Sequence, residues 1–277
     1  MGNTQPSHFS FPQFIRAVLA IVAPIAILLS AASASSTKVI YGFTGGNDGE
    51  YLDTDLVMDR AGNIYGSSVQ GGMFGSGTVF ELSHSASGWT HTVLYSFTGG
   101  NDGGEPYKGV TLDSEGNLYG AAVTGGTGSC DGGCGVVFKL TNSGGSWTQA
   151  VIHHFTGGND GSGPGSGLTF DARGNLYGMT PTGGAYGLGV LYQLQPQTNG
   201  DWKLRVLHAF TGGVDGSSAS AGRLILDHQG NLYGVTTVGG ANGDGIVFEL
   251  TRTQTGWTLF PLYAFKDQPD GALPTAA

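Results

Sequence analysis

Apolar and polar residues alternate along many short stretches of this chain, and glycine, asparagine and aspartate bound each stretch. The run from Trp147 to Phe155 is the clearest, and shorter apolar runs cover 110–113, 117–123 and 136–140. A period of two with β-branched and aromatic residues is typical of strands, and the polar clusters between the runs are typical of turns. No stretch keeps a helical period. The pattern predicts an all-β protein.

The four runs form a unit that recurs along the chain. The string GN[IL]YG begins at Gly62, Gly116, Gly174 and Gly230, and a Phe-Thr-Gly-Gly string and a tryptophan recur in the same register, with spacings of 54 to 58 residues. Four strands in a unit of this length are typical of a β-propeller blade. A β-solenoid is the alternative, but its coils are usually shorter.

The repeat predicts a propeller-like domain over residues 35–277, with four four-stranded blades and an extra N-terminal strand at Val39–Phe43. The blades are expected at about 55–97, 109–155, 167–210 and 222–265. Pro261 lies in a fourth strand, which places that strand at the outer edge of its blade. The first and third strands are the most apolar and are expected to lie deepest. We expect an incomplete or open ring that exposes apolar blade faces and self-associates through them.

The N-terminal segment 1–34 has the features of a secretory signal peptide. Arg16 precedes a 13-residue apolar run, Ala17 to Leu29, and Ala32-Ser33-Ala34 follows as a cleavage site. A membrane anchor is the alternative, but the run is too short to span a bilayer and contains Pro24. We therefore expect cleavage after Ala34 and a secreted, extracellular or cell-surface protein, with the periplasm as another location.

Composition narrows the class of partner. The chain has 52 glycines in 277 residues, 11% charged residues and a net charge of −9. Such a charge argues against binding nucleic acid, because scattered lysines and arginines cannot neutralise a row of phosphates. No second long apolar run is present, so we expect no membrane span in the mature chain.

The repeated units also carry a family resemblance. Segments such as GVTLDSEGNLYGAAVTGG, followed by CGVVFKLTNSGGSWTQAVIHHFTGGNDG, resemble the GloVer repeat of the choice-of-anchor family of bacterial surface proteins. The resemblance extends from Val39 to about Gly271. It implies export, surface display and a propeller-like fold, and it implies no activity and no catalytic residues.

Two sets of loops are the candidate ligand-binding face. In an antiparallel blade, the loops from a fourth strand to the next first strand and those from the second to the third strand emerge together, and function usually lies on such loops. The candidate residues are the aspartates of these loops, Asp48, Asp102, Asp160, Asp215 and Asp244, and Asp270 stands at a fifth equivalent place. Calcium binding is one interpretation of the TGGNDG strings. Asn-Asp-Gly turns are the other interpretation, and it is favoured because the nine-residue period of glycine-rich calcium-binding repeats is absent.

Three further groups have structural interpretations. The aspartate that ends each first strand, as in Asp59, is expected to cap a tight turn. His153 and His154 are adjacent and therefore point to opposite faces of a strand, so packing is favoured over metal binding. Cys130 and Cys134 are expected to form a disulfide in an exported protein, and two thiolates cannot complete a zinc site.

These features predict a binding or structural module whose ligand is a glycan or another surface protein. The alternative is a propeller enzyme, such as a lactonase or lyase with a metal in the channel, which the fold alone does not support. An enzyme would carry distinctive residues in one repeat. No cofactor is expected, apart from the calcium alternative, and no catalytic residue is assigned.

Overall fold

The structure is a computed structural model, and it describes residues 37–219, 222–254, 256–267 and 271–274. The chain divides into two units, Met1–Ile40 and Tyr41–Ala277. In the first unit only residues 37–40 are described, and they are exposed and form no strand. The predicted signal peptide lies outside the described residues, so its cleavage remains a prediction.

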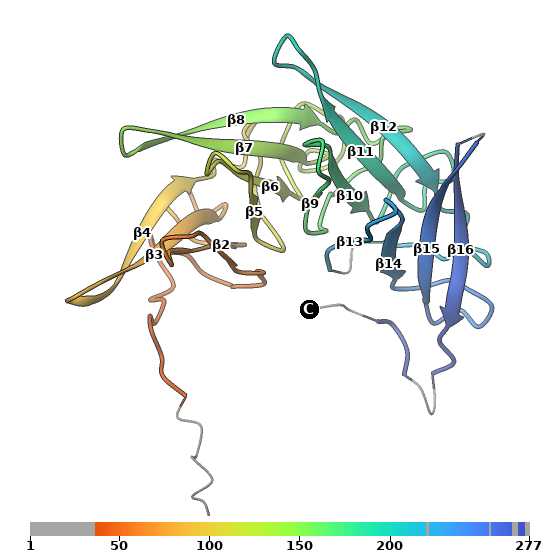
Figure 1. Ribbon diagram of the computed structural model, residues 1–277, viewed down its shortest axis with the longest axis horizontal. Helices are drawn as coiled ribbons and strands as arrows, with labels where there is room; N and C mark the ends of the chain where they lie inside the picture. The colour runs from red at the N-terminus through yellow and green to blue at the C-terminus, as the bar shows by residue number, and fades with distance from the viewer. Residues whose placement is uncertain (1–36, 220–221, 255, 268–270, 275–277) are drawn as a thin grey trace, which may run out of the picture. The chain divides into compact units, whose positions relative to one another are not determined.

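The second unit contains four four-stranded antiparallel sheets, which we number along the chain (Figure 1). The first and second sheets consist of β1 (Val57–Met58), β2 (Ile64–Ser68), β3 (Thr78–Ser85), β4 (Gly88–Ser96), β5 (Val110–Leu112), β6 (Leu118–Ala122), β7 (Val136–Ser143) and β8 (Ser146–His154). The third and fourth consist of β9 (Thr169–Phe170), β10 (Leu176–Thr180), β11 (Val190–Pro196), β12 (Trp202–Ala209), β13 (Ile225–Leu226), β14 (Leu232–Thr236), β15 (Ile246–Thr253) and β16 (Gly256–Ala264). Throughout the described ranges there are strands and turns but no helix. The all-β, four-bladed prediction is confirmed.

Strand order within each sheet follows chain order, so the fourth strand is an edge strand as predicted. It pairs with the third strand in the longest hairpin of each sheet, and each hairpin contains a bulge at the same place, for example between Val79 and Phe80. Pro261 pairs opposite Phe248 beside such a bulge, where a missing N–H disturbs the ladder least.

The last glycine of the GN[IL]YG string has a packing role. Gly120 lies opposite Phe138 in the ladder, and a Cβ atom on Gly120 would lie only 2.4 Å from the ring of Phe138. Gly66, Gly178 and Gly234 meet the aromatic ring of their own third strand in the same way. Each repeat therefore needs glycine here, so that the aromatic side chain of the third strand can pack closely against the second strand.

Consecutive sheets are joined by the phenylalanine that follows each fourth strand. Phe97 packs against Phe138 of the next sheet with ring centroids 5.0 Å apart, and Phe155 and Phe210 repeat this contact with the third and fourth sheets. All three are fully buried. Core clusters extend across these contacts from one sheet to the next, so the hydrophobic core lies between the sheets.

The predicted N-terminal strand differs from the structure. Residues 39–43 form no strand, because the described residues contain no third strand with which they could pair. Tyr41 and Phe43 nevertheless occupy the place of a strand end. Phe43 packs on Phe80 at 5.0 Å, and Tyr41 stacks on His91 at 4.5 Å. Two aromatic side chains thus make the contacts with the first sheet that the end of a fourth strand makes with the next sheet elsewhere.

The predicted depth of the strands was only half right. The second strands are the most buried, for example β6 and β10, whereas the first strands β1, β9 and β13 have two residues each and are partly or largely exposed. The second and third strands have neighbours on both edges, which covers them regardless of their composition. Among the described residues, packing between sheets joins consecutive sheets, and no further sheet covers the outer strand β16.

Candidate functional site

The aspartates in the loops between sheets each accept several hydrogen bonds inside their own loop. The Asp48 carboxylate accepts the Thr44 N–H at 2.9 Å, the Thr44 hydroxyl at 2.8 Å and the Tyr41 hydroxyl at 2.9 Å. Asp102 accepts the same three kinds of bond from Thr98 and Tyr95. The TGGNDG strings therefore fold as turns closed by their own aspartate, as the turn interpretation predicts.

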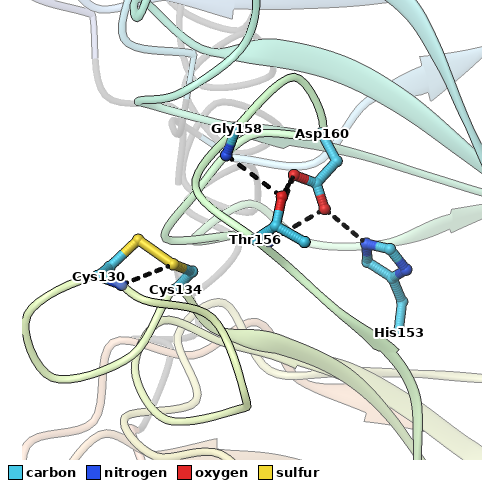
Figure 2. A network of polar contacts seen from close by, with 6 residues as sticks. All are labelled: Cys130, Cys134, His153, Thr156, Gly158 and Asp160. Atoms are coloured by element: carbon cyan, nitrogen blue, oxygen red, sulfur yellow. Dashed lines mark hydrogen bonds and ion pairs between the residues drawn. A yellow bond between two sulfur atoms is a disulfide. The ribbon is translucent and has the colours of Figure 1, made fainter.

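Histidine replaces tyrosine in the third and fourth copies of this network. Figure 2 shows the third loop, in which the imidazole Nε2 of His153 lies 3.2 Å from the carboxylate of Asp160, while Thr156 contacts the same carboxylate. His208 and Asp215 repeat the contact at 2.9 Å. His153 also packs edge-on against Phe155. The predicted packing role is thus accompanied by a hydrogen bond that the sequence analysis missed.

The electrostatics of these loops follow from burial and hydrogen bonding. Burial of Asp48 would raise its pKa, but the bonds from Thr44 and Tyr41 outweigh this effect and lower the pKa to about 2. The pKa of Asp102 and that of Asp215 are lowered for the same reasons. Burial lowers the pKa of His153, and the bond to Asp160 only partly offsets this. The loop aspartates with lowered pKa are therefore ionised and already paired with donors.

Asp244 is in a different position. It lies in a loop between a second and a third strand, and its carboxylate accepts no hydrogen bond within the ranges that the structure covers. Asp270 lies outside the described residues. The structure thus brings each fourth-to-first loop aspartate together with a threonine and a tyrosine or histidine, but it does not gather the five candidate aspartates into one cluster. A search of the described residues finds no group of three potential metal ligands.

The two kinds of loop lie side by side, as predicted. In the first repeat the Gly72 N–H donates to the Gly46 carbonyl at 2.9 Å and Glu50 bridges to Gln70, and the later repeats form equivalent bonds. At the tip of the second-to-third loop the Gly75 N–H donates to the Gly72 carbonyl, which closes a tight turn. Gly75 has φ 79°, a conformation that favours glycine. The loops are therefore held by backbone bonds.

Large apolar side chains project from these turns. Met73 and Phe74 are 74% and 56% exposed, and Tyr186, which occupies the place of Phe74 in the third repeat, is 63% exposed. Val214, in a neighbouring fourth-to-first loop, is also exposed. These residues were not among the predicted contact residues, although their position at the centre of a Gly-Gly-x-x-Gly turn is visible in the sequence.

The predicted disulfide between Cys130 and Cys134 is present (Figure 2). Cys134 is fully buried in the core cluster that contains Phe155 and Tyr192, while Cys130 is half-buried. A Cβ atom on Gly157 would lie 2.5 Å from the Cys130 sulfur. The disulfide therefore packs against the following loop, in addition to closing its own.

The turns between first and second strands have the predicted cap and one further bond. Asp113 accepts the N–H groups of Glu115 and Asn117, each at 2.9 Å, and the Asn117 side-chain amide at 2.7 Å. It also accepts the hydroxyl of Tyr119 at 3.2 Å. Asp59, Asp171 and Asp227 form the same network. The GN[IL]YG string is thus the donor set of an aspartate turn.

Comparison with known proteins gives two similar solved structures and one family match. A crystal structure of a protein of unknown function from Dyadobacter fermentans has a TM-score of 0.49 at 11% identity, covering 81% of this chain and 72% of that one. A protein from Lactobacillus plantarum has a TM-score of 0.46 at 14% identity, covering 74% of this chain and 53% of that one. A search among curated proteins finds no match. No described helix is long and apolar enough to cross a membrane. The profile of the Gloeobacter/Verrucomicrobia repeat matches residues 53–277, and the chain belongs to that repeat family.

Proposed function

We propose that the protein is an exported module that binds a glycan or another surface protein through the loop face described above. The observation that carries the proposal is the exposure of Phe74 and Tyr186 at the same position of two backbone-closed turns. Large apolar groups exposed at loop tips are typical of contact residues in binding sites. The backbone hydrogen bonds that close each turn reduce the backbone entropy that binding has to remove.

The condition of the loop aspartates supports a binding role over catalysis. A catalytic carboxylate must be free to reach a substrate, whereas Asp48 and Asp102 already accept bonds from their own loops. The same bonds leave these oxygens satisfied without calcium, so we expect chelation to shift the melting temperature by no more than about a degree or two. The disulfide agrees with an oxidising, extracellular location.

Self-association is a second part of this proposal. The outer strand β16 exposes Phe260, Leu262 and Tyr263 at 47%, 52% and 45%. The residues at the place of Leu262 in the other sheets, Leu94, Ile152 and Leu207, are half-buried or buried. A second copy could cover this face. Light scattering of the wild type and of Leu262→Ser tests the idea, and a wild type that remains monomeric at high concentration would contradict it.

The loop face is tested with the double variant Phe74→Ala, Tyr186→Ala and with Met58→Ala as a matched control. Met58 is 60% exposed but lies on β1, away from the loops. The wild type and the control should bind the same ligands on a glycan array or a panel of surface proteins, and the double variant should lose at least tenfold in affinity. Unchanged binding by a folded double variant would reject the loop face as the site.

A further inference from the structure

A polar groove lies between the third and fourth sheets, at the end of the strands opposite to the loop face. Its volume is about 570 Å³, within the range of small-ligand sites. The third sheet contributes the turn after β9, part of β11 and Arg205 of β12. The fourth contributes the turn after β13, the end of β15 and Trp257. Its lining includes Asp171, Arg173, Arg205, Asp227, Arg252 and Trp257.

Three arginines from three different elements line this groove. Arg173 lies in the turn after β9, Arg205 on β12 and Arg252 on β15, and all three are exposed. For the part of the chain that the structure describes, none of their guanidinium groups forms an ion pair or a hydrogen bond. Arg223, by contrast, donates to two backbone carbonyl groups between sheets. Three unpaired cations gathered in one hollow repel one another and favour an anionic ligand.

The two aspartates of the groove do not neutralise these cations directly. The oxygens of Asp171 accept bonds from the backbone and side chain of Asn175 and from the Tyr177 hydroxyl at 3.0 Å. Asp227 is bonded in the same way in its own turn. Both carboxylates are therefore fixed in their turns, while the longer arginine side chains remain free to meet a ligand.

The other sheet junctions lack this set of charges. At the position of Arg173 the first two repeats have Ala61 and Glu115, and at that of Arg205 they have Thr92 and Ala150. The residues at the position of Arg252 in the second and third repeats are Asn142 and Pro196. At the positions equivalent to this groove, the first junction has four acidic residues and one arginine, and the second has three acidic residues and two basic ones. Because the same fold forms without the arginines, their presence at the third junction is not a requirement of folding.

The remaining lining of the groove suits a sugar. Trp257 is half-buried and packs in one cluster with Tyr177, so it offers an aromatic surface at the groove wall. The Gln193 amide donates to the Tyr177 hydroxyl at 2.7 Å, which fixes that ring. Gln195 and Gln229 supply amide groups that can donate to and accept from hydroxyls.

We propose that this groove binds an acidic polysaccharide whose sugars carry carboxylates, as uronic acids do. Arg173, Arg205 and Arg252 pair with the carboxylates through their planar donor forks, and Trp257 supports the apolar side of a sugar ring. This site is separate from the loop face, so the two proposals can fail independently.

The test measures binding of the full chain to polygalacturonate, with neutral dextran, polyglutamate and DNA as comparison ligands. The variant Arg173→Ala, Arg205→Ala, Arg252→Asn takes its residues from equivalent positions of other repeats, so it should fold and melt as the wild type does. Arg60→Ala is the matched control, since Arg60 is an exposed arginine in the corresponding turn of the first sheet. Isothermal titration calorimetry at two salt concentrations reads out the affinity.

We expect the wild type and Arg60→Ala to bind polygalacturonate, with an affinity that falls as salt rises. The triple variant should lose about tenfold for each arginine removed. No binding by the wild type, or equal binding by a folded triple variant, would overturn the proposal. Equal or tighter binding of polyglutamate would overturn the assignment to a sugar, and equal binding of DNA would reduce the groove to a general polyanion site.

Discussion

The junction between the second and third sheets and the junction between the third and fourth sheets have the same backbone but different side chains. In each, a fully buried phenylalanine contacts an aromatic residue of the following sheet, Phe155 against Tyr192 at 5.2 Å and Phe210 against Phe248 at 5.9 Å between ring centroids. Only the second-to-third junction also contains the Cys130–Cys134 disulfide.

Outside this shared core the two junctions diverge. The third-to-fourth junction has arginines at positions where the second-to-third junction has Ala150 and Pro196. The comparison teaches that residues common to the repeats build the sheets and their contacts, whereas residues that differ are available for specificity. The stability of the two junctions should therefore respond alike to changes at shared positions and differently at the others.

Removing a shared ring should have the largest effect. Phe155→Ala and Phe210→Ala should each lower the free energy of unfolding by about 3–5 kcal/mol, because a fully buried aromatic side chain leaves a cavity. Denaturant unfolding followed by intrinsic fluorescence measures this. If the two losses of unfolding free energy differ by much more than the experimental error, the two phenylalanines do not have the same role at their junctions.

Opening the disulfide, which only the second-to-third junction contains, should have the next largest effect on stability. Cys130→Ser and Cys134→Ser both open a small ring, which costs about 2 kcal/mol. Cys134→Ser should cost more, because it also places a hydroxyl in the core around Phe155. Thermal melts of both variants, compared with the reduced wild type, test the ranking. Equal losses would mean that Cys134 contributes to stability only through the disulfide bond.

The aspartate turns should behave alike at both junctions. The pKa values of Asp113 and Asp171 lie below the ordinary 3.8: burial would raise them, but the bonds from Asn117 and Asn175 outweigh it. The unfolded chain thus binds protons more readily, so the stabilisation is complete above about pH 5 and is lost as pH falls below 3.8. Asp113→Asn and Asp171→Asn should each cost about 1.5 kcal/mol at pH 7 and much less at pH 2. Unfolding curves across this range test it, and a cost independent of pH would contradict the assignment to the ionised carboxylate.

The smallest effect should be a gain. The hydroxyl of Tyr192 is buried and has no hydrogen-bond partner among the described residues, while the other three repeats have phenylalanine at this position. Tyr192→Phe should raise the free energy of unfolding by about 1 kcal/mol, because an unsatisfied buried hydroxyl is removed. Phe248→Tyr is the reciprocal variant and should destabilise the third-to-fourth junction. A loss of stability in Tyr192→Phe would show that the hydroxyl has a partner in solution.

Much of the fold was predictable because each repeat shows its strands directly. The expected runs 110–113, 117–123, 136–140 and 147–155 correspond to β5, β6, β7 and β8, and only β7 is longer than expected, ending at Ser143. The hairpin continues there through polar residues that resemble a turn in the sequence. The depth of the first strands was mistaken, because apolar composition does not reveal how many neighbours a strand has.

The candidate site was less predictable. The alternation of tyrosine and histidine at Tyr95 and His153 indicated packing, but not the bond to an aspartate seven residues later, since the turn that brings them together is defined only in space. The arginine groove combines residues from two sheets that are up to 86 positions apart in sequence, Asp171 and Trp257. The positive charge of the groove could be recognised only once it was known which strands and turns of the two sheets face each other.

The contact made by Tyr41 and Phe43 has a consequence for how such chains change over evolutionary time. These two residues pack on the first sheet without any strand ladder, so the residues that connect a sheet to what precedes it lie in a short peptide immediately before each glycine-rich loop. Recombination between such loops would add or delete whole copies, and every copy would arrive with its connector attached. The number of repeats can thus vary between related genes without a new interface having to arise each time.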